Sequence, residues 1–185
     1  MPDLIGRYTF KFGDKGSYFK VAGLYRSLKL PESGGSQPDE TGYGISASTK
    51  FMFGNGADLR AMVTVGDGVG RYLGLAFVPD GYLDANGNIA TAEALGYFVA
   101  LRLPFGNGWR TNVMYGNTTI DYDDDVLAAG LNDTGWSFHW NLIYNILPKL
   151  DVGAEIMYAE RETVGAALPN KGDFTRFQFS AKYAF

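Results

Sequence analysis

The single histidine, His139, is the first residue to test for chemistry. Catalysis by an imidazole needs a nucleophile or a second polar partner at a fixed distance. We find no Ser, Cys or second His at a spacing typical of catalysis, so we expect His139 to form hydrogen bonds rather than to catalyse. The sequence contains no Cys, which excludes disulfides, thiolate metal sites and thiol nucleophiles.

Two stretches resemble ligand-binding loops only in part. Residues 66–70 have the spaced glycines of a phosphate loop. Phosphate binding also requires a following Lys-Ser or Lys-Thr pair and a helix, and we expect neither here. Residues 84–88 open like a calcium loop but lack Gly at the sixth position and Glu at the twelfth. We therefore expect no metal and no cofactor, and nothing in the sequence supports an enzyme.

Acidic residues gather in the loops. The densest group is Asp121, Asp123, Asp124 and Asp125, which repel one another unless water or a divalent cation separates them. A solvated loop is the expectation, with cation binding as the alternative. The formal net charge is −4, which argues against nucleic-acid binding because that binding depends on clustered cations.

Basic residues follow a different pattern, because they recur on the polar positions of alternating segments. A ladder of cations on one face of a sheet favours the passage of anions when that face lines a pore. The alternative is that these cations only neutralise nearby carboxylates and carbonyls. The candidate pore-lining residues are Arg7, Lys11, Lys20, Arg26, Lys50, Arg60, Arg102, Arg110, Arg161, Arg176 and Lys182.

The elements that position these residues are β-strands. Apolar and polar residues alternate with period two, most clearly over 136–146, which is typical of a strand with one apolar face. The aromatic content of 15% and the 25 glycines also favour strands and tight turns. We expect nine strands near residues 6–12, 17–28, 42–53, 59–67, 94–105, 109–120, 136–147, 150–161 and 174–185.

Short and long connections alternate between these strands. Asn-Gly dipeptides favour tight hairpins because their central positions take positive φ. The region 66–77 is either a long strand with a bend or a loop that folds over the rim. The short turns lie at 14–16, 55–56, 107–108 and 148–149, and the longer loops at 29–41, 68–93, 121–135 and 162–173.

Short turns at one end and long loops at the other predict an all-β fold, an antiparallel transmembrane β-barrel of meander topology, over a single domain of residues 1–185. No apolar run approaches the roughly 18 residues that a membrane-spanning helix needs. The polar positions hold isolated charges among Gly, Ser and Asn, and Trp and Tyr collect near strand ends, as at a membrane interface. A water-soluble β-sandwich is the alternative.

The final strand ends on an aromatic residue. Phe179, Tyr183 and Phe185 alternate with polar residues, and this pattern resembles the signal read by the outer-membrane assembly machinery. We therefore expect a protein of the bacterial outer membrane, in contact with the lipid bilayer and lipopolysaccharide.

The sequence also resembles the DcaP-like porins, which are trimeric outer-membrane channels of Gram-negative bacteria. Residues 2–8, 19–26 and 150–158 carry the resemblance, as overall texture rather than as a diagnostic motif. It implies a homotrimer, a larger barrel of which this chain is the C-terminal half, and negatively charged small substrates.

Nine strands is an odd number, whereas bacterial single-chain barrels have even numbers and periplasmic termini. We therefore expect this chain to form part of a larger porin barrel, a passive diffusion channel with a basic lumen for small anionic solutes such as carboxylates. The alternative is a complete small barrel of 8 to 10 strands with a structural or adhesion role and no open pore.

Overall fold

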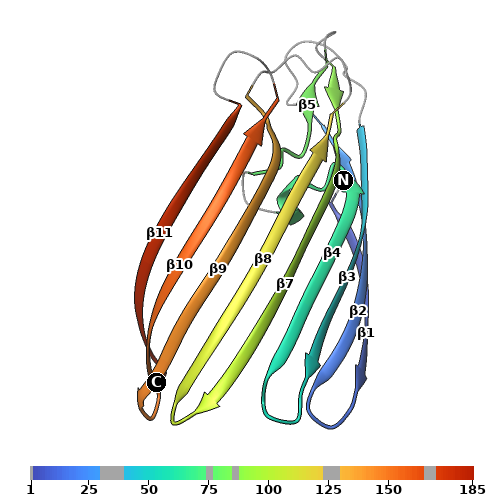
Figure 1. The fold of residues 1–185 in the computed structure, drawn as a ribbon. Coiled ribbons are helices and arrows are strands. Elements are labelled where there is room, and N and C mark those ends of the chain that lie inside the picture. The colour runs from blue at the N-terminus through green and yellow to red at the C-terminus, as the bar shows by residue number, and fades with distance from the viewer. Residues whose placement is uncertain (1, 30–39, 74–76, 85–87, 123–129, 165–169) are drawn as a thin grey trace.

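The computed structural model describes residues 2–29, 40–73, 77–84, 88–122, 130–164 and 170–185. Within these ranges nine strands form one antiparallel sheet in the order β1-β2-β3-β4-β7-β8-β9-β10-β11, so that each strand pairs with its neighbour in the chain (Figure 1). The predicted all-β meander is confirmed. The nine strands are β1 (Leu4–Phe12), β2 (Ser17–Leu28), β3 (Glu40–Met52), β4 (Asp58–Asp67), β7 (Glu93–Gly106), β8 (Trp109–Asp121), β9 (Asn132–Leu147), β10 (Leu150–Thr163) and β11 (Lys171–Tyr183).

The predicted boundaries are wrong mainly at the ends where the long loops lie. β9 begins at Asn132 rather than 136, and β11 begins at Lys171 rather than 174. Residues such as Asn132, Thr134 and Asp173 lack the apolar alternation that marked the strands, but they still pair with residues of β10. The sheet therefore rises past its apolar section into a polar end.

The short turns form as the Asn-Gly rule predicts, with one exception. Asn107 and Gly108 both have positive φ, 52° and 82°, which is the conformation that a two-residue hairpin of type I′ requires. In the turn at Asn55-Gly56 only Gly56 has a positive φ, of 82°. There Asn55 instead accepts a hydrogen bond through Oδ1 from the N–H of Ala57 at 3.1 Å.

The sheet curls around a segment that connects β4 to β7 (Figure 1). This segment contains the single-turn helix α1 (Gly70–Leu73) and a small hairpin of β5 (Tyr82–Leu83) and β6 (Ile89–Ala90). Of the two alternatives for residues 66–77, the bent strand is wrong. β4 ends at Asp67, and the described residues that follow it lie against one face of the sheet, which we call the inner face.

Glycines on the inner face allow the segment to approach. A Cβ on Gly44 or Gly66 would meet the side chain of Val69 at 2.7 Å, and a Cβ on Gly96 would meet Leu73 at 2.6 Å. Contacts this close cannot form, so a larger residue would push the segment away from the sheet. A buried cluster joins the segment to the sheet, with Val69, Val78, Tyr82 and Ala92 from the segment and Ala94 and Ile120 from β7 and β8.

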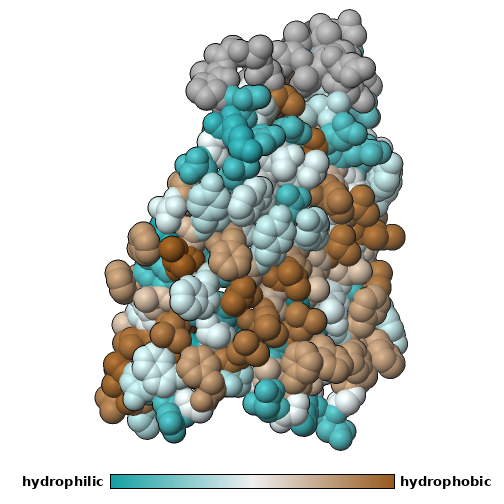
Figure 2. Space-filling model, in the orientation of Figure 1, coloured by the Kyte–Doolittle hydropathy of each residue, from teal (hydrophilic) through white to brown (hydrophobic). Residues whose placement is uncertain are grey.

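The opposite face, the outer face, is apolar and exposed. Phe177 and Phe179 of β11 have 72% and 83% of their surface accessible, and Trp140 of β9 has 52%. Figure 2 shows hydrophobic residues across the middle and lower part of the visible face, with hydrophilic residues toward the long loops. An apolar exposed surface of this extent is unusual for a water-soluble protein and typical of a surface that meets lipid or a partner.

Aromatic rings border the outer face at two levels. Toward the long loops, Tyr115 lies between Tyr97 and Trp136, with ring centroids 6.3 and 6.0 Å away, and Tyr158 follows at 5.3 Å from Trp136. Toward the short turns, the rings of Trp109 and Tyr144 stack at 4.5 Å. Two aromatic rows on either side of an apolar band are typical of a β-sheet in a bilayer.

β1 and β11 form the two edges of the sheet and do not pair with each other. The described residues contain no helix long and apolar enough to cross a membrane.

Candidate functional site

The strand register places all eleven candidate cations on the inner face. Directly paired residues of antiparallel strands share a face, so continuous rows can be followed across the sheet. Two examples are the row from Arg7 through Gly96 to Arg161, and the row that consists of Lys11, Tyr18, Lys50, Arg60, Ala100, Met114, His139, Met157 and Arg176.

Three of these cations meet in one cavity. Arg60 of β4, Arg102 of β7 and Arg110 of β8 line a hollow of about 510 Å³ on the inner face. The strand register brings them together because Asp58 pairs with Arg102 in the next strand while Arg60 follows two residues later on the same face. We call Arg60, Arg102 and Arg110 the arginine cluster.

Carboxylates partly compensate the arginine cluster. Asp58, which is 1% exposed, lies 2.6 Å from Arg60 Nε and 3.9 Å from Arg102 Nη1. Asp151 lies 2.6 Å from Arg110 Nη2, and both of its oxygens accept from that guanidinium. Asp58 precedes the predicted strand 59–67 but is the first residue of β4, so its place on this face was not predicted.

Amide side chains extend the polar floor of this cavity. Asn141 Oδ1 accepts hydrogen bonds from both the backbone N–H and the side-chain amide of Asn112, at 3.2 and 2.6 Å. Asn145 donates to Asp151 at 3.0 Å. These contacts hold the polar groups in fixed positions, so that the cavity presents oriented donors and three guanidinium groups to a solute.

His139 also lines this cavity and is part of a chain of hydrogen bonds. Its Nδ1 is 3.3 Å from Glu155 Oε1, and its Nε2 is 3.2 Å from Ser137 Oγ. Ser137 was not predicted to be a partner of His139, although residues i and i+2 of a strand share a face. Because β9 is paired on both sides, the backbone N–H groups next to Ser137 lie in the sheet ladders, where they do not stabilise an oxyanion.

Arg26 lies on the predicted face but is covered by the connecting segment. Its side chain is 2% exposed, and it donates to Asp80 at 2.8 Å and to the carbonyl of Gly68 at 3.0 Å. Asp3 lies 3.6 Å from Arg26 Nε. Arg26 therefore fixes the connecting segment on the sheet and is closed to a passing solute.

Two further cations have other partners. Arg176 Nη2 lies 3.8 Å from Glu155, and the ammonium of Lys20 lies 5.2 Å from the centre of the Tyr18 ring. Among the described residues, no ion pair within 4 Å involves the remaining five candidates, which are Arg7, Lys11, Lys50, Arg161 and Lys182.

The proposed assembly signal lies on the outer face of the last strand. Phe179 and Tyr183 are 83% and 57% exposed. Phe185 lies just after the end of β11, with its ring edge-on to Tyr183 at 5.5 Å. Their role in assembly stays a prediction.

The weaker motifs remain without a site. Residues 66–70 run from β4 into the four-residue α1, which is too short to bind phosphate. Asp121 ends β8, whereas Asp123, Asp124, Asp125 and Asn86 lie outside the described residues. No group of three or more His, Asp or Glu residues arranged for a metal ion occurs within the ranges described above.

Comparison with known proteins gives a fold but no family. No protein-family description matches the sequence, and no curated protein matches it. Among solved structures, the chain is similar over its whole length to the outer membrane channel DcaP of Acinetobacter baumannii, with a TM-score of 0.85 and 22% identity. The similarity covers 52% of that channel, so this chain spans about half its length.

Proposed function

We propose that this chain forms part of the wall of a bacterial outer-membrane diffusion channel whose basic inner face favours small anions such as carboxylates. The observation that carries the proposal is the separation of the two faces, because the inner face holds eleven cations and the outer face exposes apolar side chains. The fold shared with the DcaP channel supports a pore. The two aromatic rows support a position in a bilayer.

The charges of the inner face favour anions for a physical reason. Low-dielectric walls concentrate the field of lining charges within a pore, so these charges set selectivity even when acidic loops make the whole chain negative. An arginine can hold both oxygens of a carboxylate. Asp58 and Asp151 weaken that attraction and so favour release, which conduction requires.

The competing function is a structural or adhesion barrel whose interior is filled. One observation favours the channel over this alternative. The inner face is not filled by side chains but contains a cavity of about 510 Å³ at the arginine cluster and a second cavity of about 650 Å³. Both sheet edges are unpaired, so we propose that further strands complete the wall. Contacts with lipopolysaccharide and the assembly machinery, and a homotrimeric state, belong to the same proposal.

The test is ion selectivity in planar bilayers. Under a KCl gradient, the reversal potential of the membrane-assembled protein should show anion preference. Changing Arg60, Arg102 and Arg110 together to Glu should reduce or invert that preference, and the same triple change to Gln should reduce it without creating new repulsion with Asp58.

The control changes Lys15 and Lys149 to Glu. Both lysines lie in short turns, so the overall charge falls while the inner face is unaltered, and selectivity should stay close to that of the parent. Cation preference in the parent would contradict the proposal. An equal shift in the turn variant would show that the arginine cluster does not govern the pore.

A further inference from the structure

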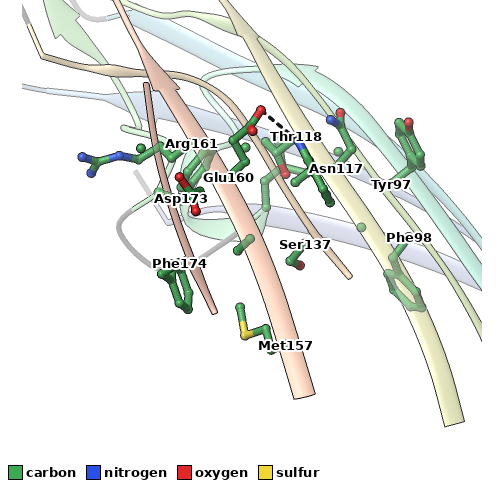
Figure 3. A pocket seen from close by; sticks show the side chains of 18 of the residues that line it. Tyr97, Phe98, Asn117, Thr118, Ser137, Met157, Glu160, Arg161, Asp173 and Phe174 are labelled. Carbon is green, nitrogen blue, oxygen red and sulfur yellow. Dashed lines mark hydrogen bonds between the residues drawn. The ribbon is translucent and has the colours of Figure 1, made fainter. Parts of the chain in front are cut away.

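A second cavity adjoins the arginine cluster on the side of the long loops, and its chemistry differs. Its volume is about 650 Å³, and its inward side chains include Met62, Phe98, Met157 and Phe174. Figure 3 shows Met157, Phe174 and Phe98 coming from three separate strands around this space. On β9, the first cavity is lined by His139 and the second by Ser137, which is the next inward residue, so the two cavities are neighbours along the strand.

Glycines form part of the floor of this apolar cavity. A Cβ on Gly116 would have Phe98 Cβ at 3.6 Å among its nearest neighbours, and a Cβ on Gly172 would meet nothing within 4 Å. The sheet surface is therefore flat and open at these two positions. Gly135, by contrast, is covered by the ring of Phe77 from the connecting segment. The cavity thus has a flat floor, apolar walls and a partial roof.

One unpaired cation lines the same space. Arg161 follows Met157 and Ala159 on the inner face of β10 and is exposed. In Figure 3 Arg161 and Phe98 lie at opposite ends of the labelled side chains. No ion pair within 4 Å involves Arg161 among the described residues. Glu160 and Asp173 also border the cavity, but their strand positions turn their side chains to the outer face.

We propose that this cavity is a binding subsite for a carboxylate attached to an aromatic ring or a short apolar chain. The apolar group lies between Met157 and Phe174, and the carboxylate pairs with Arg161, which lies on the same strand as Met157 and next to β11. A single free guanidinium beside an apolar wall matches one carboxylate on one apolar body. This inference deepens the proposed function and rests on it, because it names the anions that the channel prefers.

The experiment compares benzoate with acetate on the membrane-assembled protein. In planar bilayers, benzoate should reduce the chloride current at concentrations where acetate does not, because only benzoate fills the apolar cavity. Met157→Ser should weaken this block by about threefold or more, from the loss of apolar contact. Met114→Ser is the matched control, since Met114 is the same residue type on the same face but lines only the arginine-cluster cavity.

Two further variants separate the parts of the subsite. Gly172→Val should fill the floor beside Arg161 and weaken the benzoate block while the preference for chloride over potassium is unchanged. Arg161→Gln should reduce the block by benzoate and leave any block by uncharged benzyl alcohol as it is. Benzyl alcohol itself should block more weakly than benzoate in the parent.

The outcomes distinguish this inference from the proposed function. An anion-selective channel in which benzoate and acetate act alike would overturn the subsite and leave the channel standing. Equal effects of Met157→Ser and Met114→Ser would also overturn the subsite. A channel without anion preference would instead remove the proposed function, and the subsite with it.

Discussion

Arg26 Nη1 donates a hydrogen bond to Asp80 Oδ1 at 2.8 Å, which joins β2 to a residue 54 positions further along the chain. Asp80 also accepts from the backbone N–H and from Nε of Arg71, at 2.9 and 2.8 Å. One carboxylate thus contacts two guanidinium groups and holds the segment that connects β4 to β7 on the inner face. Phe77 and Leu73 of this segment cover the apolar cavity. The contact between Arg26 and Asp80 therefore helps to set the shape of that cavity.

The Arg26 and Asp80 pair predicts a loss of order in acid. Burial alone would raise the pKa of Asp80, but the hydrogen bonds from Arg26 and Arg71 outweigh it and lower the pKa from 3.8 to about 2. A depressed pKa stabilises the folded state at pH values above the unfolded pKa, and this stabilisation disappears as pH falls through the folded pKa. We expect the amide hydrogen exchange rates of residues 77–83, after correction for the intrinsic pH dependence of exchange, to be constant from pH 7 to 4. These corrected rates should rise between pH 4 and 2.

Asp80→Asn is the control for this pH dependence. The variant should expose the same amides at every pH, because the neutral amide removes a charged partner worth roughly 2 kcal/mol. If the parent loses protection in acid and the Asn variant loses as much over the same range, another group is responsible.

Leu142→Arg tests whether the outer face meets lipid. Leu142 pairs with Ala154, which pairs with Phe179, so it lies on the apolar face at the level of an 83% exposed phenylalanine. A charge at the middle of a bilayer should lower the free energy of unfolding in lipid vesicles by about 2 to 4 kcal/mol.

Gln178→Arg is the matched control, because Gln178 precedes Phe179 on the same strand and pairs with Glu155 on the inner face. It should change stability by no more than a few tenths of a kcal/mol. Equal stability of the two variants would show that the outer face does not contact lipid at this level.

Gly135→Ala tests the contact between the connecting segment and the sheet. A Cβ on Gly135 would overlap the Phe77 ring, so the substitution should destabilise the protein by about 1 to 3 kcal/mol in urea unfolding. Gly172→Ala, two strands away in the same row, adds its methyl group to open space and should be close to neutral.

The double variant Gly135→Ala with Phe77→Ala completes a cycle for this contact. Removal of the ring should relieve the overlap, so the two changes should couple favourably. Strict additivity would mean that Phe77 does not lie on Gly135 in the membrane.

The edges of the sheet predict pairing in the assembled protein. Lipid cannot satisfy the free backbone groups of β1 and β11. These two strands run in the same direction, since eight successive antiparallel pairings separate them, so an antiparallel wall needs an odd number of additional strands between them. Hydrogen exchange in lipid should show the outward-facing backbone amides of β1 and β11 as protected as those of β8, and free exchange at either edge would contradict this pairing.

The sequence alone determined the strands and their faces. Period-two alternation is a local property, because successive side chains of a strand point to opposite sides whatever the partner strand is. The nine strands, the positions of the short turns and the common face of Arg60, Arg102 and Arg110 could therefore be predicted. Strand ends such as Asn132 could not, since pairing with β10 rather than local pattern extends them.

Only the tertiary structure decided which charges are available to a solute. Arg26 and Arg161 both occupy polar positions of their strands. Arg26 is nevertheless buried under the connecting segment, whereas Arg161 is exposed and unpaired among the described residues. The pairing of Arg110 with Asp151 joins positions 41 residues apart. Such contacts depend on strand register and on the path of a long loop, and periodicity contains information on neither.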